Sequence, residues 1–239
     1  MTPLPTTLVL LPGLDGTEVF FRPLTAALPD WLQARTVCYP QTGAQDYPRL
    51  LAHVRRELAD LSDYYVLGAS FGGPLAVMLA AAEPQRVRGL ILSASFLRFP
   101  RPAMRPYRHA ARAPLLWLLR TLRRIPIWLL PSQDPFRQAK AETWSRVPAH
   151  VLAARMRAIG GVDVRETLRG LDLPVFCLSY ADDDVVPAHN VEDIYAHAPQ
   201  ALRAVTPGKH LGMWSHPRQT ARALAEFVAQ DQAAAAKAA

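Results

Sequence analysis

Short runs of aliphatic and β-branched residues alternate with amphipathic stretches along most of this chain. Six runs have the length of strands, and they cover residues 7–11, 36–39, 64–67, 89–92, 175–180 and 202–206. Several are apolar throughout, which is typical of parallel strands covered on both faces. The stretches between them favour helices at 20–28, 47–61, 71–82, 188–198 and 218–230. The alternation therefore predicts an α/β fold with a mostly parallel sheet of about six strands flanked by helices.

One segment interrupts this alternation. Residues 97–161 carry no strand pattern but contain many prolines and a central stretch rich in Leu, Trp and Arg. We interpret them as a helical cap inserted after the fourth strand and lying over one end of the sheet. A chain of 239 residues can hold the sheet and this insertion in a single domain, so we expect one domain over residues 1–239.

The net charge of +7 is unevenly distributed. Residues 84–133 contain ten arginines and no acidic residue, so the rest of the chain is slightly acidic. A basic surface of this kind can attract nucleic acid or an anionic surface. Nucleic acid is the poorer explanation, because the aromatic residues of the basic segment are interleaved with leucines and offer no exposed stacking platform.

Several classes of protein are disfavoured by the remaining composition. Cys38 and Cys177 are too few for a disulfide scaffold and lack the spacing of a zinc site, and we expect no metal or cofactor. No uncharged apolar run reaches the ~18 residues needed to span a membrane. Residues 1–11 have no basic region of the kind that begins a secretion signal, so we expect a cytoplasmic protein.

The most informative stretch is Gly-Ala-Ser-Phe-Gly at residues 68–72, directly after the apolar run 64–67. Small residues two before and two after Ser70 permit a tight turn from a strand into a helix. Such a turn lifts the serine hydroxyl above the sheet edge, at the positive end of the next helix. Ser70 is therefore a candidate nucleophile.

A serine hydroxyl needs a base, and the base needs a group that orients it. His210 follows the last predicted strand, so it belongs at the same end of the sheet as Ser70. Three consecutive aspartates, Asp182, Asp183 and Asp184, follow the fifth strand. Their spacing alone does not decide which of them orients His210.

A negatively charged reaction intermediate also needs hydrogen-bond donors. The backbone N–H of Phe71 lies at the predicted start of a helix, next to Ser70. The turn after the first strand, Leu-Pro-Gly-Leu-Asp-Gly at residues 11–16, places the N–H of Leu14 at the same sheet edge. An ordinary strand-to-helix turn is the alternative explanation of that glycine-bracketed sequence.

The order of three motifs along the chain resembles that of the α/β-hydrolase superfamily. The motifs are LPGLDG at 11–16, GASFG at 68–72, and DDDVVP at 182–187 followed by GKH at 208–210. The resemblance covers nearly the whole chain outside the insertion. In that family the acid commonly stands four residues before the proline, which selects Asp183. The resemblance implies Ser70 as nucleophile, His210 as base, and the N–H groups of Leu14 and Phe71 as an oxyanion hole.

Two departures from the family pattern concern the first motif and the first strand. Pro12 stands where many relatives have histidine, which should leave the backbone donors intact. The chain starts at what would be the family's third strand, so we expect the usual leading hairpin to be missing. A serine nucleophile in place of aspartate argues against dehalogenase and epoxide-hydrolase chemistry.

In overall pattern the chain is similar to small bacterial carboxylesterases, including carrier-protein methyl ester esterases. This implies a serine esterase that cleaves carboxylic esters through an acyl-enzyme, with a hydrophobic or acyl-chain substrate. Three alternatives stay open. The chain could be an acyl-carrier-protein or CoA thioesterase or methyl ester esterase, an acyltransferase, or a ligand-binding homologue without catalysis.

In relatives the cap shapes the acyl pocket, so Leu115, Trp117, Leu118 and Trp128 are expected pocket residues. Plain packing of the cap on the body explains them equally well. A basic rim would comprise Arg98, Arg101, Arg105, Arg108, Arg112, Arg120, Arg123 and Arg124. Such a rim would dock an acidic carrier protein or an anionic surface. A solvated face in an arginine-rich chain is the competing explanation.

Overall fold

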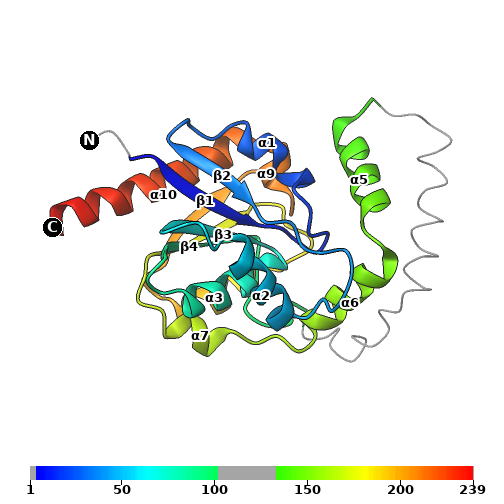
Figure 1. The fold of residues 1–239 in the computed structure, drawn as a ribbon. Coiled ribbons are helices and arrows are strands. Elements are labelled where there is room, and N and C mark those ends of the chain that lie inside the picture. The colour runs from blue at the N-terminus through cyan, green and yellow to red at the C-terminus, as the bar shows by residue number, and fades with distance from the viewer. Residues whose placement is uncertain (1–3, 102–132, 239) are drawn as a thin grey trace.

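A computed structural model describes residues 4–101 and 133–238 of the chain, and its centre is a six-stranded sheet (Figure 1). All neighbouring strands are parallel, in the order β2-β1-β3-β4-β5-β6. The strands are β1 (Thr6–Leu11), β2 (Leu32–Thr36), β3 (Tyr64–Ala69), β4 (Val87–Ser93), β5 (Val175–Tyr180) and β6 (Leu202–Thr206). The predicted six-stranded parallel sheet flanked by helices is confirmed.

The second strand lies earlier in the chain than the sequence suggests. β2 comprises residues 32–36, whereas the apolar run predicted as a strand was 36–39. As an edge strand β2 is only partly buried, so its sequence LQART carries no apolar pattern. Val37 and Tyr39 are buried just beyond the strand, where the Tyr39 hydroxyl donates to the Pro12 carbonyl at 2.9 Å.

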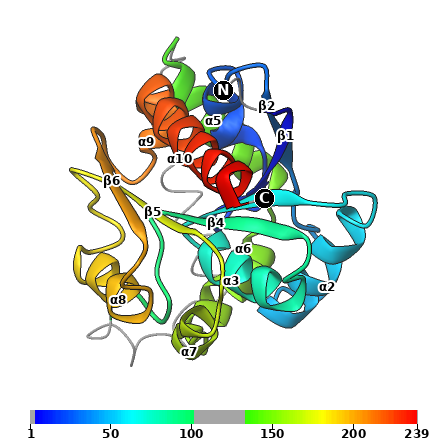
Figure 2. The same cartoon turned by 90° about the vertical axis from the view of Figure 1, so that its left-hand side faces the viewer.

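Helices cover both faces of the sheet (Figures 1 and 2). One face carries α2 (Tyr47–Glu57), α3 (Gly72–Ala82), α7 (Arg165–Arg169) and α8 (His189–His197). The other carries α1 (Arg22–Thr25), α9 (Gly212–Ser215) and α10 (Pro217–Ala238), with the short 3-10 helix η1 (Val19–Phe21) before α1. Each face has its own apolar cluster, so strand residues are buried on both sides, as the apolar runs predicted.

Several helices differ in length from the predicted stretches, and α1 covers only Arg22–Thr25 of the predicted 20–28. α2 ends at Glu57 rather than near residue 61, and the carbonyls of Leu58 and Leu61 beyond its end accept hydrogen bonds from the Arg86 guanidinium. α10 continues past residue 230 to Ala238. Within the described residues, no helix is both long enough and apolar enough to cross a membrane.

The described part of the predicted insertion holds α5 (Pro135–Arg146) and α6 (Ala149–Ile159). Both lie beyond the carboxyl end of the sheet (Figure 1), the end at which β1 leads into the 12–17 loop and β3 into Ser70. Asp134 begins α5 by accepting a hydrogen bond from the Phe136 N–H at 3.1 Å, with Pro135 as the first helical residue. Leu115, Trp117, Leu118 and Trp128 lie outside the described residues.

Candidate active site

Ser70 lies in the turn between β3 and α3, in a strained backbone conformation with φ of 50°. Residues other than glycine rarely adopt this backbone conformation. The positions on either side, Gly68 and Gly72, have no room for a side chain. A Cβ on Gly68 would lie within 3 Å of the Gly73 backbone, and one on Gly72 within 3 Å of the Pro12 carbonyl oxygen. The sequence Gly-x-Ser-x-Gly therefore forms the sharp turn that it predicts.

Neighbouring backbone and side-chain groups hold this turn in place. The Ser70 N–H donates to the Ser93 carbonyl at 2.9 Å, which joins the turn to the end of β4. The Ser70 carbonyl accepts from the Gly73 N–H at 3.0 Å and from the Ser95 hydroxyl at 2.8 Å. The strained residue is thus fixed by three hydrogen bonds.

His210 lies in the loop between β6 and α9 and bridges Ser70 and Asp183. Its Nε2 is 3.0 Å from Ser70 Oγ, and its Nδ1 is 2.9 Å from Asp183 Oδ2 and 3.1 Å from Oδ1. The two loops are joined by a hydrogen bond of 3.0 Å from the Asp182 N–H to the Gly208 carbonyl. The structure therefore brings together a hydroxyl, an imidazole and a carboxylate from three loops.

Asp183 is the aspartate of the three that reaches His210. Its Oδ1 also accepts from the N–H groups of Val185 and Val186, at 2.8 and 3.0 Å. Burial by itself raises the pKa of Asp183, but the contact with His210 and the two N–H groups outweigh it and hold that pKa below its usual range. Asp182 and Asp184 are exposed, and Asp184 lies 3.6 Å from Lys209.

Leu14 and Phe71 line the same cavity as Ser70, and each has a backbone N–H that could serve as a donor there. Among the described residues, neither group donates to a backbone or side-chain oxygen. Leu14 belongs to a turn in which the Gly16 N–H donates to the Gly13 carbonyl at 3.0 Å, and Gly16 has a φ of 69°. Free donors of this kind can bind an anionic oxygen.

A cavity of about 420 Å³ lies over these groups. Its wall includes Ser70, His210 and Leu14, and most of the remaining lining is apolar. Helices α5 and α6 and the turn between them contribute, among others, Lys140, Thr143, Trp144, Val147 and Leu152. Sequence reasoning missed these five, because it searched for pocket residues in the most apolar stretch of the insertion, whereas α5 has a mainly polar sequence.

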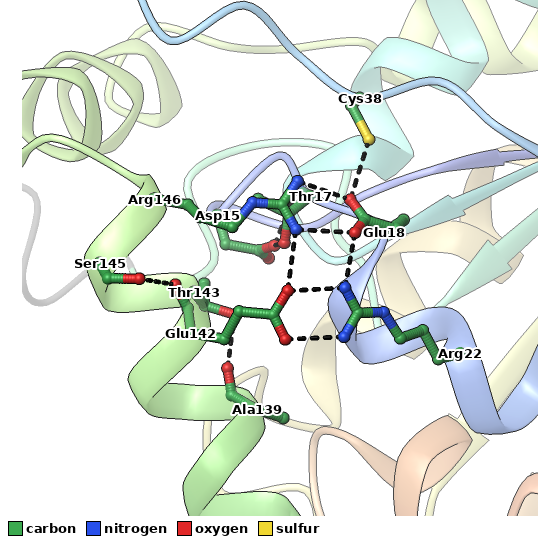
Figure 3. Close-up of polar contacts among 10 residues, drawn as sticks. All are labelled: Asp15, Thr17, Glu18, Arg22, Cys38, Ala139, Glu142, Thr143, Ser145 and Arg146. Atoms are coloured by element: carbon green, nitrogen blue, oxygen red, sulfur yellow. Dashed lines mark hydrogen bonds and ion pairs between the residues drawn. The ribbon is translucent and has the colours of Figure 1, made fainter.

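Charged side chains attach α5 to the main body (Figure 3). Glu142 of α5 binds the Arg22 guanidinium through both oxygens, at 2.6 and 2.7 Å, and Arg146 binds both oxygens of Glu18, at 2.7 and 2.9 Å. Arg22 also reaches Glu18 at 2.8 Å, and Arg146 reaches Glu142 at 3.1 Å. The four residues form a closed network of alternating charge beside the cavity.

Two arginines of the predicted basic rim lie in the described part of the chain, and both have partners. Arg98 forms an ion pair with Asp193 of α8 at 3.0 Å. Arg101 donates to the carbonyls of Asp184 and Val185, the latter at 3.1 Å. Arg101 therefore supports the loop that carries Asp183, whereas Arg98 binds α8. The other six rim arginines lie outside the described residues.

Over residues 4–101 and 133–238, no three His, Cys, Asp or Glu side chains cluster as a metal site would require. Cys38 and Cys177 are both free thiols.

A family model described as serine aminopeptidase, S33, matches residues 41–210, which include Ser70, Asp183 and His210. The chain is 29% identical over 174 residues to the pimeloyl-[acyl-carrier protein] methyl ester esterase of Nitrosomonas europaea, covering 65% of this chain and 68% of that protein. It is 26% identical to the protein of the same name from Aliivibrio salmonicida, covering 92% and 91%.

Solved structures give the same fold. The enol-lactonase of Burkholderia xenovorans superposes with a TM-score of 0.78 at 17% identity, covering 93% of this chain and 91% of that one. At this identity the likeness shows a shared α/β-hydrolase fold.

Proposed function

Because this chain belongs to the serine aminopeptidase S33 family of the α/β-hydrolase superfamily, we propose that it is a serine esterase that hydrolyses carboxylic esters. The observation that carries the proposal is the position of His210, within hydrogen-bond distance of both Ser70 Oγ and the Asp183 carboxylate. A hydroxyl, an imidazole and a carboxylate in this order activate a nucleophile without a metal ion.

In the first half of the reaction, Ser70 Oγ attacks the ester carbonyl while His210 Nε2 takes its proton. Asp183 keeps the Nδ1 proton of His210 in place and stabilises the imidazolium that forms. The N–H groups of Leu14 and Phe71 bind the oxyanion of the tetrahedral intermediate. When the intermediate collapses, the alcohol leaves with the proton from His210, and the acyl group remains on Ser70.

In the second half, water replaces the alcohol. His210 Nε2 removes a proton from the water, whose oxygen attacks the acyl carbonyl in the same oxyanion hole. Collapse returns the proton to Ser70 Oγ and releases the carboxylic acid. One ester and one water thus give one acid and one alcohol, and the enzyme is unchanged.

The shape and lining of the cavity favour a substrate with an apolar acyl group. A volume of about 420 Å³ lies within the range of small-molecule sites, and its walls are mostly hydrophobic. Trp144, Val147 and Leu152 would contact the acyl chain from the α5 and α6 side.

A methyl ester carried by an acyl-carrier protein is a second candidate substrate. It is favoured by the two esterase relatives and by Lys140, which supplies a cation at the cavity wall. Comparing kcat/KM for a carrier-linked methyl ester and the free ester of the same acid separates the two candidates. Product analysis with competing thiols and alcohols separates hydrolysis from acyl transfer.

The proposal is tested by Ser70→Ala with p-nitrophenyl butyrate as substrate. We expect kcat to fall by at least about 10³-fold, because the nucleophile is lost, with a circular dichroism spectrum like that of the unsubstituted protein. Ser145→Ala is the matched control. Ser145 is exposed on α5, where its hydroxyl donates to the Glu142 carbonyl, and its loss should leave kcat within about twofold. Equal turnover in Ser70→Ala and Ser145→Ala would contradict the proposal.

A further inference from the structure

Arg155 of α6 is a completely buried arginine, with 0% of its surface exposed. Its guanidinium donates four hydrogen bonds. Nη1 reaches the carbonyls of Leu14 at 3.1 Å and Asp15 at 2.6 Å, Nη2 reaches the Pro40 carbonyl at 3.0 Å, and Nε reaches Gln45 Oε1 at 2.9 Å. A residue of the insertion is thereby joined to the loop beside Ser70.

The acceptors of Arg155 are neutral oxygens. In the part of the chain that the structure describes, no carboxylate lies within ion-pair distance of this guanidinium. Burial lowers the pKa of Arg155 to about 10, so the group still carries its charge at neutral pH. The Asp15 carboxylate interacts with Arg155 electrostatically but forms no direct ion pair with it. A buried charge held in this way is costly to fold, and apolar residues of similar volume often serve stability as well. Stability alone is therefore a poor explanation of an arginine here.

The loop that Arg155 contacts has four consecutive carbonyls with fixed partners. The Pro12 carbonyl accepts from the Tyr39 hydroxyl, the Gly13 carbonyl from the Gly16 N–H, and the Leu14 and Asp15 carbonyls from Arg155. Arg155 also lies 5.3 Å from the centre of the Tyr39 ring. With every carbonyl of the row engaged, the peptide planes of the loop cannot rotate freely, while the Leu14 N–H stays without an acceptor among the described residues.

Gly16 shows how closely this loop fits around the guanidinium. A Cβ at residue 16 would lie within 3 Å of the Arg155 guanidinium carbon and of the Tyr39 ring. The glycine of the LPGLDG sequence therefore leaves room for the arginine as well as adopting a positive φ.

We propose that Arg155 is a positioning residue for the oxyanion hole. Its Nη1 fixes the Leu14 and Asp15 carbonyls, the two that follow the Gly13–Leu14 peptide, and so holds the loop in the conformation in which the Leu14 N–H faces the reacting carbonyl oxygen. The inference rests on the proposed esterase function. It makes the insertion a structural part of the oxyanion hole, because α6 supplies the arginine. A lysine cannot replace it, since a single ammonium lacks the fork that spans three carbonyls.

The test is Arg155→Lys, assayed with p-nitrophenyl butyrate and with a trifluoromethyl ketone that adds to Ser70 as a tetrahedral oxyanion. We expect kcat to fall about tenfold to a hundredfold with KM within about threefold, because the donor acts in the transition state. The inhibition constant of the ketone should rise by the same factor as kcat/KM falls. A wild-type kcat and inhibition constant in folded Arg155→Lys would overturn the inference.

Arg86→Lys is the matched control. Arg86 also lies against a tyrosine ring and binds two carbonyls, those of Leu58 and Leu61, but at the opposite end of the sheet. This variant should lose stability without losing kcat. If Arg86→Lys lowers kcat as much as Arg155→Lys, the effect is one of general stability, and the inference fails.

Tyr39→Phe is a second variant, for the case in which Arg155→Lys does not fold. It removes the hydroxyl that binds the Pro12 carbonyl and should lower kcat about threefold to tenfold at constant KM. An unchanged kcat in Tyr39→Phe would then overturn the inference.

Ser70→Ala, measured alongside, separates the two proposals. If Ser70→Ala still turns over the ester, the proposed serine esterase function is wrong. If turnover requires Ser70 but is unchanged in Arg155→Lys, only the positioning role of Arg155 is wrong.

Discussion

At position 70 a serine occupies a backbone conformation that costs roughly 1–3 kcal/mol for a residue with a side chain. The residues around Ser70 allow it to keep this strained backbone conformation. A Cβ on Gly68 would collide with the backbone of the turn, and one on Gly72 with the Pro12 carbonyl oxygen. One on Gly73 would displace the Ser95 side chain, whose hydroxyl donates to the Ser70 carbonyl. The strain is therefore localised at the residue that carries the proposed chemistry.

Gly72→Ala should destabilise the protein by about 1–3 kcal/mol, because the new methyl group would lie within 3 Å of the Pro12 carbonyl oxygen, and backbone cannot move aside cheaply. The measurement is urea unfolding followed by circular dichroism. Gly170→Ala is the matched control. A Cβ there meets only ordinary contacts at 3.6 Å and beyond, with φ of −83°, and stability should change by about 0.5 kcal/mol or less. Equal stability of the two variants would contradict the steric argument.

Asp183→Asn should lower kcat by about 10³- to 10⁴-fold, because an amide can hold His210 in the wrong tautomer. Asp184→Asn, its matched control, changes an exposed carboxylate near Lys209 and should keep kcat within about twofold. A larger loss in Asp184→Asn would show that the wrong aspartate has been assigned.

Acid titration gives a second measurement on the same two variants. Burial raises the pKa of Asp183, but His210 and two N–H groups lower it by more than burial raises it. The folded state therefore favours the ionised carboxylate. The resulting stability is complete above the ordinary aspartate pKa of 3.8 and is lost as pH falls through the lower folded value. Below about pH 4, urea midpoints should therefore fall more steeply for the unsubstituted protein and Asp184→Asn than for Asp183→Asn.

At the scale of elements, α5 is attached mainly through its polar side. Ala139 and Thr143 are its buried residues, and Phe136 near its start packs against Phe20 and Trp214. The last turn is held by the network of Glu142, Arg146, Glu18 and Arg22 (Figure 3). A helix that forms the wall of the cavity is thus fixed at one end by rings and at the other by charges.

Glu142→Gln should weaken this attachment, because it leaves two arginines to share Glu18 alone. We expect a loss of about 1 kcal/mol and faster hydrogen exchange of the α5 amides, with the difference shrinking in 1 M salt. Glu226→Gln is the matched control, since Glu226 pairs with Arg222 on the exposed side of α10. It should cost about 0.5 kcal/mol or less and leave α5 unchanged. Exchange rates in α5 that are the same in both variants would contradict this role of the network.

At the scale of the whole molecule, parallel strands bring distant residues to one edge. Ser70 follows β3, Asp183 follows β5 and His210 follows β6, and all three strands point the same way. Because carboxyl ends of parallel strands share an edge, the sequence could predict the meeting of these loops. It could also predict both candidate oxyanion donors, since each directly follows a recognisable strand.

Other features could not be predicted from sequence patterns. β2 has the weak pattern of a half-exposed edge strand. The predicted run at 36–39 shares only Thr36 with it, and the buried residues of that run, Val37 and Tyr39, lie in the loop beyond the strand. The residues of α5 that line the cavity look like those of a solvated helix, because only one narrow side of that helix faces inward.

The sequence by itself determined the fold class and the groups that meet at the carboxyl edge, because strand periodicity and the Gly-x-Ser-x-Gly turn are local properties of the chain. Spacing alone leaves three adjacent aspartates open, and Asp183 is selected only through the resemblance to a family motif. Tertiary structure shows the contact of Asp183 with His210, and it alone shows which arginine is buried against the Leu14 loop. Both depend on contacts between residues far apart in sequence. Local sequence patterns do not predict which side chain fills a given space in the tertiary structure.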